Sequence, residues 1–143
     1  MGCVFLTLDE VLALHDDQIR RYGGEPGLRD PGLLSSAVAT PRATFAGELL
    51  HESLFEGAAA YLYHLAKNHP FVDGHRRTAL ASCLAFLWLN DDRLEAGEDE
   101  LTELVVGVAA GRVSKAQVAV FLEDRCRPAG SADSGPTTGT SSG

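Results

Sequence analysis

Residues 68–80 read NHPFVDGHRRTAL, and this stretch decides the interpretation of the whole chain. It contains two imidazoles and a carboxylate, those of His69, Asp73 and His75, together with a glycine and two adjacent arginines. Residues 78–89 then form an apolar run with only mildly polar interruptions. That order is typical of a loop that leads into the first turn of a buried helix.

The first turn of such a helix attracts anions, because its backbone N–H groups point outward and the helix dipole adds partial positive charge. Arg76 and Arg77 add full positive charge at the same place. Gly74 has no Cβ and lets a ligand approach the backbone closely. The pattern therefore predicts a phosphate-binding site made by Gly74, His75, Arg76 and Arg77.

His69 and Asp73 supply two further groups that transfer of a phosphoryl or nucleotidyl group to a hydroxyl requires. A histidine side chain exchanges its proton near neutral pH, so His69 is the candidate catalytic base. Asp73 offers a hard oxygen ligand to a Mg²⁺ ion that bridges the phosphates of ATP or another nucleoside triphosphate. The structural alternatives are a helix C-cap for His69, a helix N-cap for Asp73 and a solvated pair for the arginines. The combined spacing favours the phosphate site.

The expected helix over residues 53–68 places His69 at its C-terminal end, which opposes a simple role as a base. The helix dipole favours a cation there and tends to keep a proton on the imidazole. Asp73, a metal ion or the target would have to change that balance. An alternative use of His69, Asp73 and His75 is as a chelate for a transition metal, although no fourth ligand is evident.

The stretch resembles the motif of the Fic/Doc family, which reads His-x-Phe-x-Asp/Glu-x-Asn-x-Arg. His69, Phe71, Asp73 and Arg77 match the motif, and His75 stands where the family has Asn. The resemblance is greatest to the Doc branch and implies an all-α fold, a bundle of about six helices around a central buried helix. It covers roughly residues 4–125, and the other segments that carry it in order and spacing are Phe5-Leu6-Thr7, Arg29-Asp30, Pro41-Arg42-Ala43-Thr44-Phe45, Ala66-Lys67-Asn68-His69-Pro70-Phe71 and Arg77-Thr78-Ala79-Leu80.

The resemblance also implies a transferase that uses ATP and Mg²⁺. Most Fic proteins move AMP from ATP to a Ser, Thr or Tyr hydroxyl of a target protein. The Doc branch instead moves the γ-phosphate to a threonine of elongation factor Tu and so arrests translation. The family's inhibitory Ser/Thr-x-x-x-Glu-Gly/Asn pattern is not present in its usual form, because Glu52 stands four residues before Glu56. Control by a separate small antitoxin is therefore expected.

Residues 41–52 have few periodic apolar positions, and we expect them to form an exposed flap after a short helix that ends at Thr40-Pro41. By the same resemblance, this flap would hold the protein target in an extended conformation beside the active site, through Pro41, Arg42, Ala43, Thr44 and Phe45. The alternative is a plain connecting loop.

His75 leaves three hypotheses for the function. The first is a toxin-type protein kinase of the Doc branch. The second is a nucleotidyltransferase that acts on a hydroxyl of a protein or of a small molecule. The third is a repurposed member of the fold that serves in binding, because His75 has disabled transfer. A histidine is bulkier than the family's amide, but its ring nitrogens can also donate hydrogen bonds.

Composition excludes other classes of protein. The formal net charge of −8 argues against a nucleic-acid partner, which requires a basic face. No apolar run reaches the roughly 18 residues of a membrane span, and no secretory leader is evident, so we expect a cytoplasmic protein without a membrane partner. The three cysteines are scattered and indicate neither a disulfide framework nor a metal site.

One domain over residues 1–126 is expected, since 143 residues with 45% apolar content suit a single core. Residues 75–89 are apolar nearly all round, so we place that helix at the centre. His15 lies on the apolar stripe of the first helix, where we favour a hydrogen-bonded core histidine over a catalytic one. Pro, Gly, Ser and Thr dominate from Arg127 onward, which predicts a disordered tail over 127–143. The helices are predicted over residues 8–22, 31–39, 53–68, 75–89, 98–110 and from 115 onward.

Overall fold

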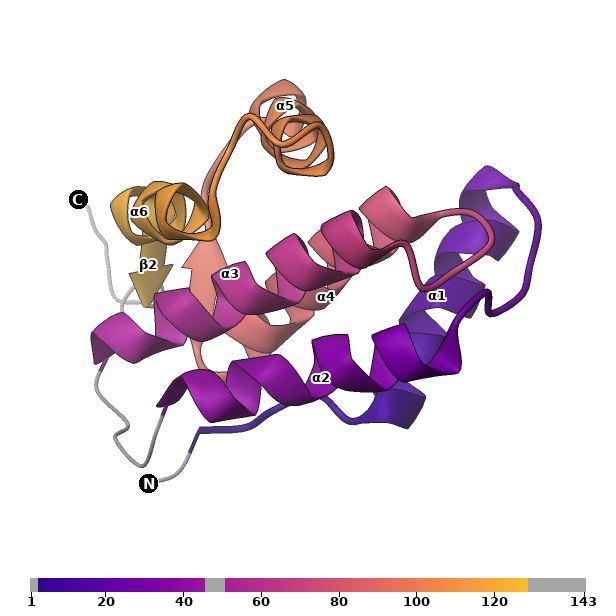
Figure 1. Ribbon diagram of the computed structural model, residues 1–143. Helices are drawn as coiled ribbons and strands as arrows, with labels where there is room; N and C mark the ends of the chain where they lie inside the picture. The colour runs from indigo at the N-terminus through magenta and orange to yellow at the C-terminus, as the bar shows by residue number, and fades with distance from the viewer. Residues whose placement is uncertain (1–2, 46–50, 129–143) are drawn as a thin grey trace.

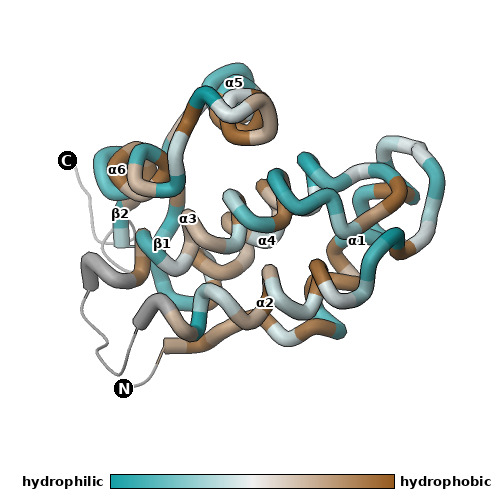
Figure 2. Tube along the Cα trace, viewed as in Figure 1, coloured by the Kyte–Doolittle hydropathy of each residue, from teal (hydrophilic) through white to brown (hydrophobic). Residues whose placement is uncertain are grey.

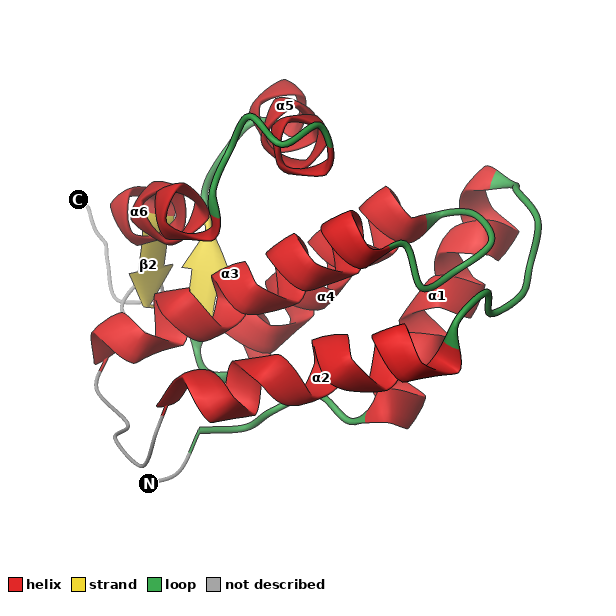
Figure 3. Cartoon of the chain, in the orientation of Figure 1, coloured by secondary structure: helices red, strands yellow, loops and turns green. Residues whose placement is uncertain are grey.

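A computed structural model of the chain describes residues 3–45 and 51–128 (Figure 1). Helices dominate these residues, as Figure 3 shows, so the predicted all-α class is confirmed. In chain order the elements are α1 (Leu8–Tyr22), α2 (Pro31–Phe45), α3 (His51–Asn68), α4 (His75–Leu89), β1 (Asp92–Leu94), α5 (Glu98–Ala109), α6 (Lys115–Arg125) and β2 (Cys126–Pro128).

The helix at the centre of the bundle is α3, which packs against α2, α4, α5 and α6. Residues 58–62 of α3 are completely buried, and the first three of them are alanines, whose small side chains let neighbouring helices approach closely. The prediction that residues 75–89 form the central helix is wrong. α4 buries one face and leaves Trp88 64% and Leu89 41% exposed at its last turn. An apolar sequence on all sides of a helix does not reveal which sides other helices cover.

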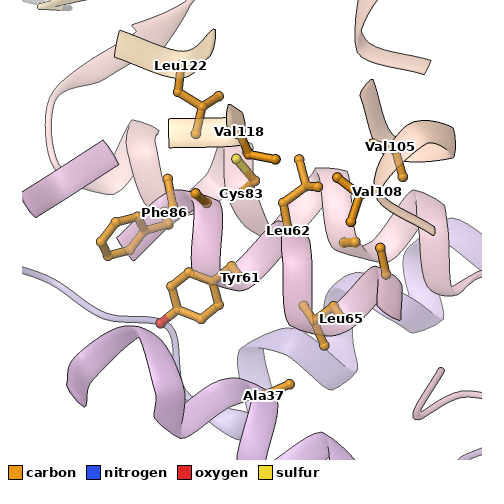
Figure 4. Close-up of a cluster of buried hydrophobic side chains, with 14 of the residues drawn as sticks. Ala37, Tyr61, Leu62, Leu65, Cys83, Phe86, Val105, Val108, Val118 and Leu122 are labelled. Carbon is orange, nitrogen blue, oxygen red and sulfur yellow. The ribbon is translucent and has the colours of Figure 1, made fainter. Parts of the chain in front are cut away.

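The core gathers side chains from all six helices. Figure 4 labels those that α2, α4, α5 and α6 place around Tyr61, Leu62 and Leu65 of α3. The ring of Tyr61 lies 5.1 Å from that of Phe86, centroid to centroid. Its hydroxyl oxygen accepts a hydrogen bond from the backbone N–H of Leu6 over 2.9 Å, so this buried polar atom is paired. Burial raises the pKa of Tyr61 to about 12, which keeps the phenol neutral.

Hydrophilic and hydrophobic residues both occur along α5 and α6 (Figure 2). The buried residues of these two helices, which face the core, are Leu104, Val105, Gly107 and Val108 in α5 and Val118 and Leu122 in α6. Within the described residues, no helix is both long enough and apolar enough to span a bilayer.

α2 is longer than predicted. The helix passes through Thr40-Pro41 without ending and continues to Phe45, so the expectation of a non-helical segment over residues 41–45 is wrong. Arg42 and Ala43 are exposed, as expected of the flap, whereas Pro41 is not. Pro41 is buried on the same side of the helix as Leu34 and Ala37, and packing of this stripe offsets the backbone hydrogen bond that proline cannot donate. Residues 46–50, which belonged to the same expected flap, lie outside the described residues.

A short two-stranded ribbon joins the chain after α4 to the chain after α6. β1 and β2 are antiparallel, with Asp92 opposite Pro128 and Leu94 opposite Cys126. The predicted disordered tail is therefore wrong for Arg127 and Pro128, which belong to β2. Arg127 also forms an ion pair with Glu95, Nε to Oε1, at 2.7 Å. Residues 129–143 lie outside the described part of the chain.

Candidate active site at the start of α4

The loop between α3 and α4 is held against the loop between α1 and α2, and both lie at the same end of the bundle (Figure 1). The backbone N–H of Val72 donates to the carbonyl of Gly27 over 3.1 Å, and Leu28 and Phe71 form an isolated antiparallel bridge. These backbone hydrogen bonds join two loops that are distant in sequence. The 68–80 stretch therefore has a defined shape before any ligand arrives.

Phe71 and His15 anchor this loop in the core. Phe71 is 2% exposed, and its ring stacks on that of His15 with centroids 3.8 Å apart and planes at 5°. His15 Nε2 lies 2.7 Å from the carbonyl oxygen of Asp73, and because a carbonyl only accepts, the imidazole nitrogen donates. His15 is 6% exposed, so the prediction of a hydrogen-bonded core histidine is confirmed.

The first turn of α4 forms the wall of a polar hollow. Gly74 precedes the helix in the left-handed region, with φ of 74°, which favours a residue without Cβ. The first bond of the helix runs from Thr78 N to Gly74 O over 3.0 Å, so the N–H groups of residues 75–77 have no acceptor inside the helix. An open hollow of about 160 Å³ lies beside them, lined by Asp73, Gly74, His75, Arg76 and Arg77.

Asp73 is ionised at the edge of this hollow. Its Oδ1 accepts from the N–H of Gly74 over 2.8 Å, and its Oδ2 accepts from the N–H of Glu25 over 3.3 Å. These two bonds, with smaller contributions from Arg77 and His75, lower the pKa of Asp73 below its ordinary value. Each oxygen keeps a lone pair, so one exposed carboxylate is available as a ligand.

This donor set fits Mg²⁺ better than a transition metal. Mg²⁺ is commonly held by one or two carboxylates, waters and the phosphates of a substrate. A transition-metal site needs several protein ligands, and among residues 3–45 and 51–128 no three His, Cys, Asp or Glu side chains are grouped to hold an ion. Among these residues, His69, Asp73 and His75 are not grouped as a three-ligand chelate.

His69 is the first residue after α3, and its side chain is exposed. It has φ of 52°, a left-handed conformation that costs a residue with Cβ about 1–2 kcal/mol. Its ring lies against that of His75, with centroids 4.0 Å apart and planes inclined at 51°. Since His75 lines the hollow, the candidate base His69 is separated from the candidate phosphate site by the side chain of His75.

A cation at the end of α3 comes from a residue outside the motif. Arg29 Nε donates to the carbonyl of His69 over 2.7 Å, and Arg29 Nη2 donates to the carbonyl of Asn68 over 3.0 Å. Arg29 therefore adds positive charge at the end that the helix dipole favours, in addition to Lys67 in the last turn of α3. Arg29 is part of a segment that carries the family resemblance, but the sequence did not predict this contact, because its two partners are 40 and 39 residues away.

His75 is half-buried, and its pKa falls to about 4. Burial is the main cause, and the neighbouring His69 and Arg76 add to it by repulsion while Asp73 opposes them. The ring is therefore neutral at pH 7. A neutral imidazole offers one N–H donor and one acceptor nitrogen, so it does not add a positive charge to the anion site.

Both arginines are exposed. Arg77 Nη2 donates to the carbonyl of Gly23 over 3.3 Å, and its guanidinium lies 5.2 Å from the ring centre of Tyr22. Both arginines also line a second, mostly apolar hollow of about 240 Å³, which continues over Leu80, Thr102, Val105 and Val106.

Residues 5–87 match the Fic/DOC family. The chain belongs to the Fic/Doc family. It is 42% identical over 117 residues to the protein kinase doc of Escherichia phage P1, a match that covers 82% of this chain and 91% of the relative. It is also 47% identical over 78 residues to the toxin Doc of Mycolicibacterium smegmatis, covering 54% of this chain and 60% of that protein.

Within the Fic/Doc fold, the predicted site residues fall into two groups. Asp73, Gly74, His75, Arg76 and Arg77 share one hollow, and His69 contacts it through His75. The residues expected in a flap, 41–45, form the C-terminal end of α2, whereas the other end of α2 adjoins the site through Asp30 N and Pro70 O at 3.0 Å. Ten residues of helix span about 15 Å, so residues 41–45 lie away from the hollow. Their role toward a target stays a prediction.

Proposed function

We propose that this Fic/Doc protein is the toxin of a toxin–antitoxin pair and transfers the γ-phosphoryl group of ATP, or of another nucleoside triphosphate, to a hydroxyl of a protein target. The observation that carries the proposal is the hollow at the start of α4, where free N–H groups, two arginines and a carboxylate meet beside an imidazole pair. The similarity to a protein kinase over 91% of that relative favours phosphoryl transfer over nucleotidyl transfer.

The phosphates would lie against the first turn of α4. The N–H groups of residues 75–77 and the Arg76 guanidinium are available for phosphate oxygens, and positioned charge of this kind is the main contribution of a protein to phosphoryl transfer. Arg77 would have to give up its long bond to Gly23 to join them. The neighbouring apolar hollow, which shares both arginines, suits the base of a nucleotide rather than a free phosphate.

Asp73 would hold a Mg²⁺ ion, which when bound neutralises charge on the transferred phosphate. The carboxylate is held in place by the N–H groups of Gly74 and Glu25, so its orientation does not depend on the ion. Its low pKa keeps it in the form that binds a cation at neutral and mildly acidic pH.

His69 would take the proton of the target hydroxyl as the hydroxyl oxygen attacks the γ-phosphorus. The bond from that phosphorus to the bridging oxygen then breaks, and ADP leaves. By the resemblance, the family's Asn contacts a phosphate of the nucleotide, and His75, neutral at pH 7, would replace it with one donor and one acceptor nitrogen. The resemblance to Doc makes elongation factor Tu in the cytoplasm the first target to test and a small antitoxin the expected inhibitor.

The test is transfer of label from ATP labelled at either the α or the γ position. Purified protein would be incubated with Mg²⁺, elongation factor Tu and each labelled ATP. We expect label from the γ position on the target and none after His69→Ala. Label from the α position would contradict the proposal in favour of nucleotidyl transfer. No label together with no ATP binding would favour a member disabled by His75, and restoration of transfer by His75→Asn would identify that residue as the cause.

A further inference from the structure

The carboxyl end of α3 is closed by a side chain from the loop between α1 and α2. The last four carbonyls of a helix have no partner inside it. Arg29 donates to Asn68 O over 3.0 Å and to His69 O over 2.7 Å. Two adjacent carbonyls at the point where the helix ends are therefore bound by one guanidinium.

This contact requires the geometry of arginine. A guanidinium presents several N–H groups in a rigid planar fork, whereas an ammonium is a compact point charge on a flexible stem. Nε and Nη2 lie on one edge of that fork and face the two carbonyls together. A lysine at position 29 keeps the charge but cannot make both bonds in the same fixed arrangement.

The backbone that carries Arg29 is itself fixed. The N–H groups of Arg29 and Asp30 both donate to Pro70 O, over 2.8 and 3.0 Å. Asp30 then begins α2, because its Oδ1 accepts from Leu33 N over 3.0 Å. The guanidinium thus extends from a rigid junction between the start of α2 and the end of α3.

His69 is the residue that this junction constrains. Its φ of 52° is unfavourable for a side chain with Cβ, and relaxation to negative φ would rotate the imidazole relative to the loop. The ring now lies 4.0 Å from that of His75, which lines the hollow. Holding the His69 carbonyl therefore holds the imidazole beside the hollow.

We propose that Arg29 is a positioning residue. It clamps the carbonyls of Asn68 and His69 and so keeps His69 in the left-handed conformation that presents its imidazole to the reaction. The effect of Arg29 on catalysis rests on the proposed phosphoryl transfer. The hydrogen bonds of Arg29 to the two carbonyls do not depend on it.

The kinetic test compares Arg29→Gln and Arg29→Lys with Arg21→Gln, a control arginine on α1 that is exposed and paired with Asp17. The assay uses γ-labelled ATP, Mg²⁺ and elongation factor Tu. We expect kcat to fall on the order of 100-fold in both Arg29 variants, as for a misplaced catalytic group, and their KM for ATP to stay unchanged. The kcat of the control Arg21→Gln should equal that of the natural protein. Guanidinium ions, below the concentration that unfolds the protein, should partly restore Arg29→Ala but not His69→Ala. Full kcat in Arg29→Lys, or the absence of rescue, would overturn the positioning role.

A second measurement needs no activity. The ¹³C shifts of the Asn68 and His69 carbonyls report their hydrogen bonds, and we expect both to change in Arg29→Gln and Arg29→Lys but not in Arg21→Gln. Unchanged carbonyl shifts would overturn the clamp. If the natural protein transfers no label, the proposed function fails, and the carbonyl shifts still decide whether Arg29 holds His69.

Discussion

His15 donates a hydrogen bond to the carbonyl oxygen of Asp73 over 2.7 Å, although 58 residues separate them. The donor comes from the middle of α1, and the acceptor belongs to the loop that carries the candidate chemistry. The same imidazole stacks on Phe71, with centroids 3.8 Å apart. A single buried ring therefore fixes both the apolar anchor of the loop and the backbone next to its carboxylate.

Removing this donor should loosen the loop. We expect His15→Leu to lower the free energy of unfolding by about 1–2 kcal/mol, because the Asp73 carbonyl loses its partner in a partly buried place. His15→Gln keeps an N–H donor and should lose less. Urea unfolding of the three proteins measures the difference. Equal stability of His15→Leu and the natural protein would show that the bond contributes nothing.

His75 should make stability depend on pH. Its pKa is about 4 in the folded protein and near 6.5 in the unfolded chain, so between these values the unfolded chain binds more protons. The free energy of unfolding should therefore fall as the pH decreases from about 6.5 towards 4. The slope should stay well below roughly 1.4 kcal/mol per pH unit, since the ring is only half-buried and solvent screens it.

His75→Asn removes the titrating ring and should flatten that part of the profile. Urea unfolding at several pH values in this window provides the comparison with the natural protein. If the two proteins lose stability in parallel, another group is responsible.

Gly24 should be required for the position of Asp73. A Cβ at Gly24 would lie 2.9 Å from Asp73 Oδ2, whereas a Cβ at Gly23 would meet nothing within 4 Å. Both glycines have positive φ, of 122° for Gly24 and 82° for Gly23, so alanine at either position costs about 1–3 kcal/mol of stability. Only Gly24→Ala should also displace the carboxylate and lower phosphoryl transfer, on the order of tenfold or more. Equal activities of the two variants would contradict this.

Asp73→Asn should raise the concentration of Mg²⁺ needed for half-maximal transfer by about tenfold or more, because the only charged ligand proposed for the ion is lost. Asp16→Asn on α1 is a suitable control, since that carboxylate is 67% exposed and pairs with Arg20 on the same helix. Titration of transfer activity with Mg²⁺ measures the change. An unchanged requirement in Asp73→Asn would show that the metal is held elsewhere.

The buried hydroxyl of Thr78 should lower the free energy of unfolding. Among the described residues, its hydroxyl is completely buried and has no hydrogen-bond partner, as is also true of Ser82. Thr78→Val removes the unpaired oxygen at nearly constant shape, so the free energy of unfolding should rise by about 1 kcal/mol. Thr102→Val on the exposed side of α5 should change it by less than about 0.5 kcal/mol. A destabilised Thr78→Val would indicate a buried water that pairs the hydroxyl.

Local patterns predicted most of the helices because their signals lie within a few residues of one another. Ser114 and Gln117 form the capping box that begins α6, and Gly23 ends α1. The end expected for α2 at Pro41 failed because burial of that residue against the bundle offsets its missing N–H. The strand residues Arg127 and Pro128 were missed because their partners lie in β1, more than thirty positions earlier.

The sequence by itself determined the family, the helical class and the set of groups at the start of α4, since the spacing from His69 to Arg77 carries them. Only the tertiary structure decided that α3 is the central helix, that His15 and Arg29 hold the loop, and that His75 is neutral at pH 7. The physical reason is the distance along the chain over which the interactions act. A motif or a helix depends on near neighbours in the chain. Burial, the pKa of a half-buried side chain and the hydrogen bonds of Arg29 depend on residues that are far apart in the chain and that folding brings together.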